Sequence, residues 1–580
     1  MRTRIQLLFV GFLVGIGAII IRLAYWQIIQ GQSLKLQAQA QYTATDVTTP
    51  ERGNIYTSDG YPLVINRPVY TLGAYSPAVK LPPQTIVSEI MPLLKFTVDD
   101  PAVATDPAKS KAALADIENN TKNTMLDRLG HTGYSVLERD LSQEEKEGIS
   151  ALGISGLTFD QSFTRDYPEA SMSAAVTGFV GRDNVGESTG YFGLEGFYDR
   201  ELAGRVGIST VERDAAGNPL LIGDYQTLLG RNGRSLRLYM NRGIEYIVNE
   251  ELKSAVERYG AAGGDVVVMD PQTGGILAMA GYPSYDPAKF NNYDPGLYKN
   301  PVVADAYEPG STFKVLVMAA ALNENAVTET DKCDICTGPV TIGPYTIRTW
   351  DNKYHPLSTP EDILVHFDNV GMVWVERKLG RDKMLQYINN YGFGEKTGID
   401  LQEEVSSNLR DKWGDIDYAT SSFGQGIAVT SIQMVRAVAA IANGGLLMEP
   451  HVVQAVVGDS GVQAIAPKVV RRVFSADTAS RMTSLMVAAV DKGEAKWTDI
   501  PGYNIAGKTG TAQIPVAGHY DATKTIASFV GFAPAENPRF VMLVKLREPT
   551  SSPWGSETAA PLWFAIARKL LLEYNIPPTN

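Results

Sequence analysis

The sequence has little of what binds nucleic acids or metal ions. Its 580 residues carry a formal net charge of −12, and no run of Lys or Arg supplies the positive field that phosphate binding requires. No nucleic-acid partner is therefore expected. The only cysteines, Cys333 and Cys336, form a lone C-x-x-C, and none of the five histidines stands at a spacing that would complete a zinc site. A local disulfide or two free thiols are better interpretations, and no metal is expected.

The sequence also lacks low-complexity tracts, which argues against wholesale disorder. Hydrophobic residues make up 44% and charged residues 20%, a composition that can form packed cores. A chain of this length is too long for a single core, so we expect about two to four domains.

Long apolar runs are rare, and the one that stands out lies at the N-terminus. Residues 7–29 are interrupted by one charge, Arg22, and approach the roughly 20 residues that a bilayer requires. Arg2 and Arg4 precede the run, so residues 1–6 are expected in the cytoplasm and the rest of the chain on the outer side of the cytoplasmic membrane. A single-pass lipid anchor is the favoured interpretation. A cleaved signal peptide is the alternative, although no A-x-A-like site follows directly.

Two regions follow this run. Residues 30–232 are polar and punctuated by Gly and Pro, with a charged segment at about 81–160 that is expected to form an inserted helical lobe. No reactive groups converge there, so we interpret the region as a non-catalytic pedestal. Residues 233–580 have strand-like segments near both ends and helix-rich sequence between them. This order predicts an α+β domain, with one antiparallel sheet closed by distant segments and helices packed on it.

A serine and a lysine stand one helical turn apart after a Pro-Gly pair. Ser311 and Lys314 open an apolar stretch, and a helix is expected to begin at or near Ser311. The stretch is apolar on every face, so it should be buried together with Lys314. Burial disfavours the ammonium form, and Lys314 could then take the proton of Ser311. The spacing alone is weak evidence, and a capping serine with a snorkelling lysine is the alternative.

The triplet Lys-Thr-Gly occurs twice. Residues 507–512 combine it with further small and hydroxyl residues in a strand-like segment, which lets a ligand backbone lie alongside and suits an anionic group. The second copy, at 396–398, has loop-like neighbours. We therefore favour Lys508 over Lys396.

Ser-x-x-Lys followed far downstream by Lys-Thr-Gly resembles the penicilloyl-serine transferases, which include penicillin-binding proteins and serine β-lactamases. Over nearly its whole length the sequence is similar to class B penicillin-binding proteins, the monofunctional transpeptidases of elongation and division. The resemblance implies an antiparallel sheet flanked by helices, an all-helical subdomain, an extended pedestal and one membrane helix. The matching stretches are Arg52-Gly53, Gly193-Leu194-Glu195, 307–314, Trp350-Asp351-Asn352, 422–426, 442–445 and 507–513.

The same resemblance implies the roles of the site residues. Ser311 would be the acylated nucleophile and Lys314 its general base, and Asn369 and Lys508 would also be catalytic. The backbone N–H groups of Ser311 and Thr511 would form an oxyanion hole. The residues expected to bind the carboxylate of the substrate or of a penicillin are Lys508, Thr509, Gly510 and Thr511.

The implied reaction is acylation by a D-Ala-D-Ala stem peptide with loss of D-Ala, then transfer to an amine of a neighbouring stem. The implied partners are peptidoglycan stem peptides, β-lactams and a membrane glycan polymerase. No metal or organic cofactor is implied.

One motif departs from the family pattern. The family has Ser-x-Asn, and the matching text here is Phe367-Asp368-Asn369, with phenylalanine in place of the serine. That hydroxyl is thought to relay a proton to the leaving amine, which phenylalanine does not do. The expected consequence is slow turnover, a proton path through water or His366, or loss of the reaction, unless Phe367 merely fills a pocket.

Three functions therefore compete. An active transpeptidase is the leading hypothesis. A catalytically impaired scaffold or activator of a glycan polymerase is motivated by Phe367. A hydrolase of the carboxypeptidase or β-lactamase kind uses the same chemistry, but a hydrolase needs no long pedestal.

Overall fold

Two compact units make up the chain. One contains residues 1–52 and 203–233, and the other contains residues 53–202 and 234–580. Every residue proposed above for the site lies in the second unit. The computed structural model describes residues 2–35, 43–98, 103, 106–184, 186, 188–212, 225–407, 409–516 and 519–578.

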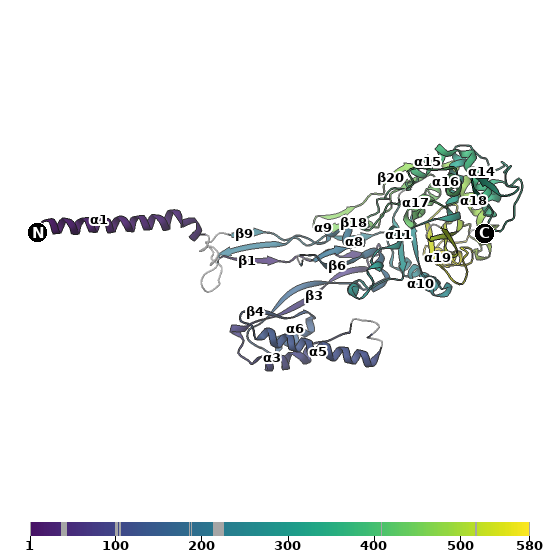
Figure 1. Cartoon of the computed structure of the whole chain (residues 1–580). Coiled ribbons are helices and arrows are strands. Elements are labelled where there is room, and N and C mark those ends of the chain that lie inside the picture. The colour runs from purple at the N-terminus through teal and green to yellow at the C-terminus, as the bar shows by residue number, and fades with distance from the viewer. Residues whose placement is uncertain are drawn as a thin grey trace. The chain divides into compact units, whose positions relative to one another are not determined.

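The first unit contains the apolar N-terminal helix (Figure 1, purple). Helix α1 (Arg2–Ala24) continues into a π-helical turn, Tyr25–Ile29, and no residue of these two elements is buried inside the protein. A helix of this length and composition fits a single-pass membrane anchor. The unit also contains an antiparallel sheet in the order β1 (Thr43–Thr48), β8 (Gly207–Glu212) and β9 (Tyr225–Leu228).

In the second unit, one sheet combines strands that are far apart in the sequence. Its order is β19 (Gly461–Ala464), β18 (Val453–Gly458), β10 (Ser235–Leu238), β2 (Ile55–Tyr56), β3 (Pro62–Tyr75) and β4 (Tyr134–Leu141), and β5 (Leu157–Asp166) also pairs with β3. A buried ion pair supports this sheet, because Arg165 lies 2.7 Å from Glu195 and also donates to the Gly53 carbonyl oxygen. Two of the stretches that match the family, at residues 52–53 and 193–195, are therefore joined through Arg165.

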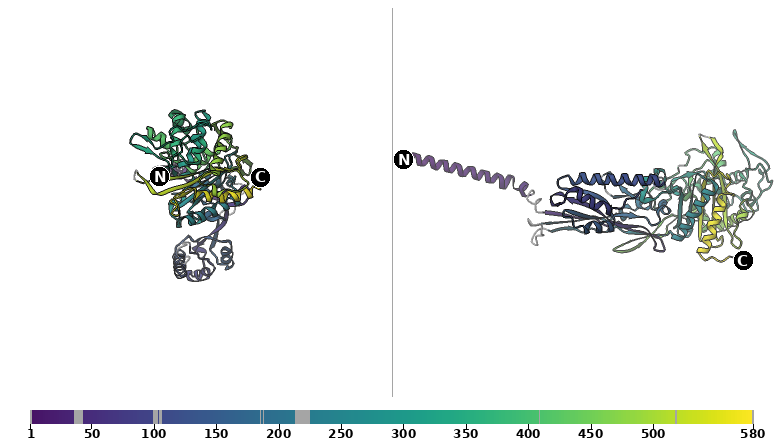
Figure 2. Two further views of the ribbon diagram at one scale, coloured as in Figure 1. Left: turned by 90° about the vertical axis from the view of Figure 1, so that its right-hand side faces the viewer. Right: turned by 90° about the horizontal axis from the view of Figure 1, so that it is seen from below.

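A lobe of three helices packs beside β3, β4 and β5 (Figure 2, dark blue). Its helices are α3 (Pro83–Ile90), α5 (Pro107–Leu129) and α6 (Gln143–Ala151). The expectation of an inserted helical lobe at about 81–160 was wrong for β4 and for the start of β5. The charged residues of β4 are typical of an exposed helix, but Leu137 and Leu141 of this strand are buried against the lobe.

A five-stranded antiparallel sheet forms the centre of the C-terminal region. Its order is β12 (Ile276–Tyr282), β11 (Gly263–Met269), β23 (Phe540–Arg547), β22 (His519–Ala533) and β21 (Ala506–Val516). Two strands come from the start of this region and three from its end, so the expectation of a sheet closed by distant segments is confirmed. Strand β21 lies at one edge, where it pairs with β22.

Helices cover both faces of this sheet. Successive strand residues point to opposite sides, so each face presents its own set of apolar side chains to the helices. Val266 and Val268 pack in a core with α10 (Arg242–Tyr259) and the C-terminal α19 (Ala559–Glu573; Figure 1, yellow). Val267 and Met269 pack on the other side. The helices on that side include α12 (Lys314–Asn323), α17 (Ser431–Ala442) and α18 (Ala476–Asp491).

Shorter elements complete the second unit. The two-stranded ribbons are β6 (Phe179–Arg182) with β7 (Ser188–Tyr191), β13 (Ala306–Tyr307) with β16 (Val429–Thr430), β14 (Val340–Ile342) with β15 (Tyr345–Ile347), and β17 (Leu446–Met448) with β20 (Val469–Arg472). The shorter α-helices are α7 (Ala174–Thr177), α8 (Gly193–Phe197), α9 (Asp199–Leu202), α11 (Pro301–Ala304), α13 (Pro360–Val365), α14 (Asn369–Leu379), α15 (Arg381–Asn390) and α16 (Asp415–Ser421).

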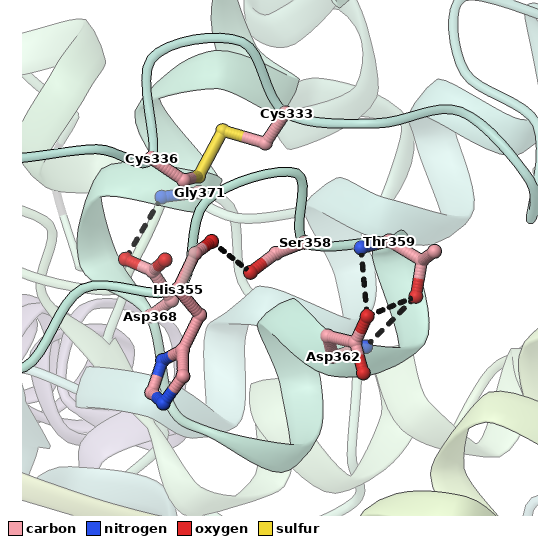
Figure 3. Close-up of a disulfide and its surroundings, with 8 residues drawn as sticks. All are labelled: Cys333, Cys336, His355, Ser358, Thr359, Asp362, Asp368 and Gly371. Atoms are coloured by element: carbon pink, nitrogen blue, oxygen red, sulfur yellow. Dashed lines mark hydrogen bonds between the residues drawn. A yellow bond between two sulfur atoms is a disulfide. The ribbon is translucent and has the colours of Figure 1, made fainter.

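The two cysteines form a disulfide (Figure 3). Cys333 and Cys336 are both buried, and their Cα atoms lie 5.6 Å apart. The Cys333 N–H donates to the Ser358 carbonyl oxygen, and Asp368 caps α14 by accepting from the Gly371 N–H. Figure 3 shows the disulfide beside Asp368 and Gly371, at the start of α14.

Candidate active site

Ser311 lies in a 3-10 turn, Gly310–Phe313, that leads directly into α12. The turn begins at a position that only glycine adopts easily, because Gly310 has φ +57°. Its N–H donates to the Gly424 carbonyl oxygen at 3.0 Å. The helix begins close to Ser311, as the sequence predicted, and the serine side chain is half-buried.

Lys314, the first residue of α12, is fully buried. Its Nζ donates to the Phe367 carbonyl oxygen at 2.7 Å. Burial lowers the pKa of Lys314 to about 7, while the nearby carboxylates of Asp368 and Glu494 act in the opposite direction. The lysine is therefore a base with a substantial uncharged fraction near neutral pH, as its place in an apolar helix predicted.

The edge strand β21 contains the Lys-Thr-Gly triplet and passes close to the Ser311 turn. A Cβ at Gly510 would come within 2.8 Å of the Pro309 carbonyl oxygen, so only glycine fits there. The Thr511 hydroxyl accepts from the Gly555 N–H at 2.9 Å. Close approach of strand and turn thus brings the two distant motifs together.

Lys508 is almost completely buried, with 2% of its surface exposed. Burial and the nearby Lys314 lower its pKa well below the ordinary value, and Glu494 opposes that shift. Its Nζ donates to the Thr509 carbonyl oxygen at 3.3 Å. The second copy of the triplet differs, because Lys396 is exposed in a loop between α15 and α16.

The loop between α13 and α14 presents Phe367 to both lysines. Phe367 has φ +60°, an unusual backbone conformation for a bulky residue, and this conformation accompanies the hydrogen bond from Lys314 to its carbonyl oxygen. The Lys508 Nζ lies 3.0 Å from the centroid of the Phe367 ring. The backbone of Phe367 therefore contacts one lysine and its side chain covers the other.

Asn369 and His366 flank Phe367 but differ in their surroundings. Asn369 is half-buried, and its Nδ2 donates to the Arg348 carbonyl oxygen at 3.2 Å. His366 is exposed and stacks on His355, with ring centroids 4.2 Å apart.

A small cavity of about 80 Å³ lies at the junction of these elements. It brings together four of the residues expected from the sequence, Ser311, Asn369, Thr509 and Thr511. In the part of the chain that the structure describes, Lys314, Lys508 and Gly510 do not line it. The lining residues are Gly310, Ser311, Trp350, Phe367, Asn369, Phe423, Gln425, Glu494, Thr509, Thr511, Trp554 and Ser556.

Sequence reasoning missed three polar or aromatic residues of this cavity. Trp554 and Ser556 come from the segment after β23. The ring of Trp554 packs edge to face against that of Trp350, with the ring centroids 5.2 Å apart. Glu494 comes from the segment after α18. None of the three stands in a recognisable motif, so only the tertiary packing identifies them.

The fold and the motif geometry define a penicillin-binding transpeptidase. Residues 264–571 match the Penicillin binding protein transpeptidase domain, and residues 47–238 match the Penicillin-binding Protein dimerisation domain. The chain belongs to the class B penicillin-binding proteins.

Individual relatives resemble the chain over nearly its full length. Stage V sporulation protein D of Bacillus subtilis is 32% identical over 594 residues, covering 99% of this chain and 87% of the relative. The probable peptidoglycan D,D-transpeptidase PenA of Neisseria gonorrhoeae is 29% identical over 582 residues, covering 100% of this chain and 94% of the relative. The crystal structure of penicillin-binding protein 3 of Mycobacterium tuberculosis, complexed with ampicillin, shares the fold with a TM-score of 0.67 and 23% identity over 92% of this chain and 97% of that chain.

Proposed function

We propose that the chain is a serine-type peptidoglycan D,D-transpeptidase that is acylated at Ser311. The observation that supports this most strongly is a half-buried serine at a cavity, followed one turn later by a buried lysine whose pKa is about 7. An uncharged amine beside a hydroxyl is the arrangement that activates an otherwise weak nucleophile. The N. gonorrhoeae relative is named as a peptidoglycan D,D-transpeptidase, which agrees with this proposal.

In the proposed reaction, the Ser311 Oγ attacks the carbonyl carbon of the penultimate D-Ala. A C–O bond forms, the Oγ proton moves to Lys314, and the N–H groups of Ser311 and Thr511 stabilise the oxyanion. The peptide C–N bond then breaks, and the departing D-Ala nitrogen takes up the proton that Lys314 received. The amine of a neighbouring stem peptide attacks the ester carbon and forms the new C–N bond. The ester C–O bond breaks, and the proton that the amine loses returns through Lys314 to the Ser311 Oγ.

The remaining motif residues would hold the substrate. Lys508, Thr509 and Thr511 would bind its terminal carboxylate, Gly510 lets the strand approach the serine, and Asn369 would orient the peptide at the cavity wall. A penicillin has a carboxylate and a reactive amide of the same kind, so it would acylate Ser311 as its ring C–N bond opens. The M. tuberculosis structure with ampicillin is consistent with this sensitivity.

The proposed location follows from the N-terminal helix. Arg2 and Arg4 would keep residues 1–6 in the cytoplasm, residues 7–29 would span the inner membrane, and residues 233–580 would work outside it. Residues 30–232 would serve as the non-catalytic pedestal. In this arrangement the anchor and pedestal would let the enzyme work beside a membrane glycan polymerase.

The decisive experiment is an intact mass of the full-length protein in detergent after incubation with a labelled penicillin. We expect an adduct on the wild type that is absent from Ser311→Ala. Ser484→Ala is the matched control, since Ser484 lies on the exposed side of α18. The control should keep the adduct.

The other outcomes separate the competing functions. No adduct on the wild type would contradict the proposal and favour the scaffold that Phe367 suggests. An adduct that disappears within minutes would point instead to a hydrolase. A mass increase that persists in Ser311→Ala would show that another residue is acylated.

A further inference from the structure

Two tryptophans meet at the wall of the cavity, and both keep part of their surface exposed. Trp350 is 49% exposed and Trp554 is 38% exposed, and both line the cavity together with Ser311. Their rings pack edge to face, with the centroids 5.2 Å apart. Single exposed tryptophans are ordinary on a protein surface, but two in contact beside a nucleophile form an apolar surface that a ligand can cover.

The backbone of Trp554 is fixed beside strand β21. Its neighbour Gly555 donates its N–H to the Thr511 hydroxyl at 2.9 Å. A Cβ on Gly555 would come within 2.3 Å of the Gly510 carbonyl oxygen, so this segment packs tightly on the strand. The Thr558 hydroxyl donates to the Trp554 carbonyl oxygen at 2.8 Å. Trp554 therefore lies next to the part of β21 that would bind the substrate carboxylate.

Trp350 comes from a segment that contacts the start of α14. The Asn369 Nδ2 donates at 3.2 Å to the carbonyl oxygen of Arg348, two residues before Trp350. Thr349, which lies between them in the sequence, is buried. The tryptophan pair thus connects the segment that contacts β21 with the segment that contacts Asn369.

Under the proposed function, the leaving amine and the acceptor amine use the same space in turn. The leaving D-Ala has the terminal carboxylate, so it would lie at Thr509 and Thr511. Both amines react at the same carbonyl carbon, and microscopic reversibility requires the entering amine to approach along the path by which the leaving amine departs. The chain behind the entering amine would then pass Thr511 and lie against Trp554.

The faces of the two indole rings suit an aliphatic chain that ends in an amine. Methylene groups gain contact with an apolar ring, and the ring face attracts an ammonium group. We propose that Trp350 and Trp554 form the subsite for the acceptor and bind the aliphatic stem of its primary amine. An ammonium group bound there releases one proton to solvent before the uncharged amine attacks the ester. This inference rests on the proposed function.

The test is the partition of one acyl-enzyme between an amine and water. The full-length protein in detergent receives the thioester of N-acetyl-D-Ala with thioglycolate as the donor and Nα-acetyl-lysine as the acceptor. Mass spectrometry then measures the amide and the hydrolysis product. Both products come from the same acyl-enzyme, so their ratio does not depend on the acylation rate. We expect Trp350→Leu and Trp554→Leu each to lower the ratio of amide to hydrolysis product by about fivefold.

Three comparisons separate contact with the rings from a general structural effect. Trp350→Tyr keeps an aromatic face and should retain most of the wild-type ratio. With Nα-acetyl-diaminopropionate, whose amine has a stem of one methylene group instead of four, the leucine variants should stay within about twofold of the wild type. Trp497→Leu is the matched control, because Trp497 is exposed and, among the residues that the structure describes, does not line the cavity. It should keep the wild-type ratio with both acceptors.

The outcomes distinguish this inference from the function on which it rests. Amide formation by the wild type with an unchanged ratio in both leucine variants would overturn the acceptor subsite and leave the transpeptidase proposal intact. Equal losses with the long and the short acceptor would also overturn the subsite, because they would indicate a structural effect. Absence of an acyl-enzyme on the wild type would overturn both proposals. If one leucine variant does not fold, the other decides the question.

Discussion

The sequence Lys-Thr-Gly occurs in two regions of the molecule, and the two copies have different surroundings. Lys508 lies almost completely buried in edge strand β21, beside the turn that contains Ser311. Lys396 is exposed in a loop, and the Thr397 hydroxyl donates to the buried carboxylate of Glu404. In the first triplet, Thr509 lines the cavity. In the second, Thr397 stabilises its loop through the hydrogen bond to Glu404. A short motif therefore acquires its chemistry from the element and the neighbours around it.

The largest expected difference between the two regions is in acylation. Lys508→Met removes the ammonium that would bind the carboxylate, so acylation by penicillin should slow by roughly 100-fold or more. Lys396→Met makes the same chemical change on an exposed loop and should leave the rate within about twofold of the wild type. Stopped-flow or gel measurement of adduct formation with a fluorescent penicillin provides both rates. Equal effects of the two substitutions on the acylation rate would contradict the claim that only the buried copy of the triplet takes part in acylation.

The pH dependence of the acylation rate tests the consequence of burying Lys314. Lys314 has a pKa of about 7 and must be uncharged to act as a base. As the pH falls below that value the ammonium form grows, so the acylation rate should fall about tenfold per pH unit. A rate that stays constant through this acidic range, with the protein folded, would exclude Lys314 as the base that limits acylation.

A substitution of Phe367, in the loop between α13 and α14, is expected to make acylation faster rather than slower. Phe367→Ser restores a hydroxyl near both lysines and removes the ring over Lys508, so acylation should become faster, by roughly tenfold. Phe367→Leu is the control, since it removes the aromatic ring without adding a hydroxyl. An unchanged rate in Phe367→Ser would show that the missing hydroxyl does not limit the reaction.

The smallest effect on acylation is expected in the second triplet, where stability should change instead. Thr397→Ala removes one donor to the buried carboxylate of Glu404 and should lower the free energy of unfolding by about 1–2 kcal/mol. Thr509→Ala should instead slow acylation, and it should lower the free energy of unfolding by less than Thr397→Ala does. Chemical denaturation and the penicillin assay, run on both variants, measure the two effects. A slowed acylation in Thr397→Ala would contradict the structural role.

Much of the fold was predictable because local patterns specify it. The apolar N-terminal run, the strands on either side of residue 274 and the three C-terminal strands all follow from hydrophobic runs separated by turn residues. The helical expectation for residues 134–141 was wrong, because the charged residues at 138–140 are typical of an exposed helix and only the pairing with β3 makes the segment a strand. The disulfide was one of two alternatives, since spacing alone does not fix the separation of two cysteines.

By itself, the sequence determined the spacing of Ser311 and Lys314, the all-apolar helix that buries the lysine, and the family to which the motifs are similar. Only the tertiary structure decided how segments far apart in the chain meet. It turned the Phe367 carbonyl oxygen toward Lys314, set the ring over Lys508, and brought Glu494 and Ser556 to the same cavity. The physical reason is that propensity and periodicity are local, whereas a pKa or a cavity depends on atoms that meet only after the chain has folded.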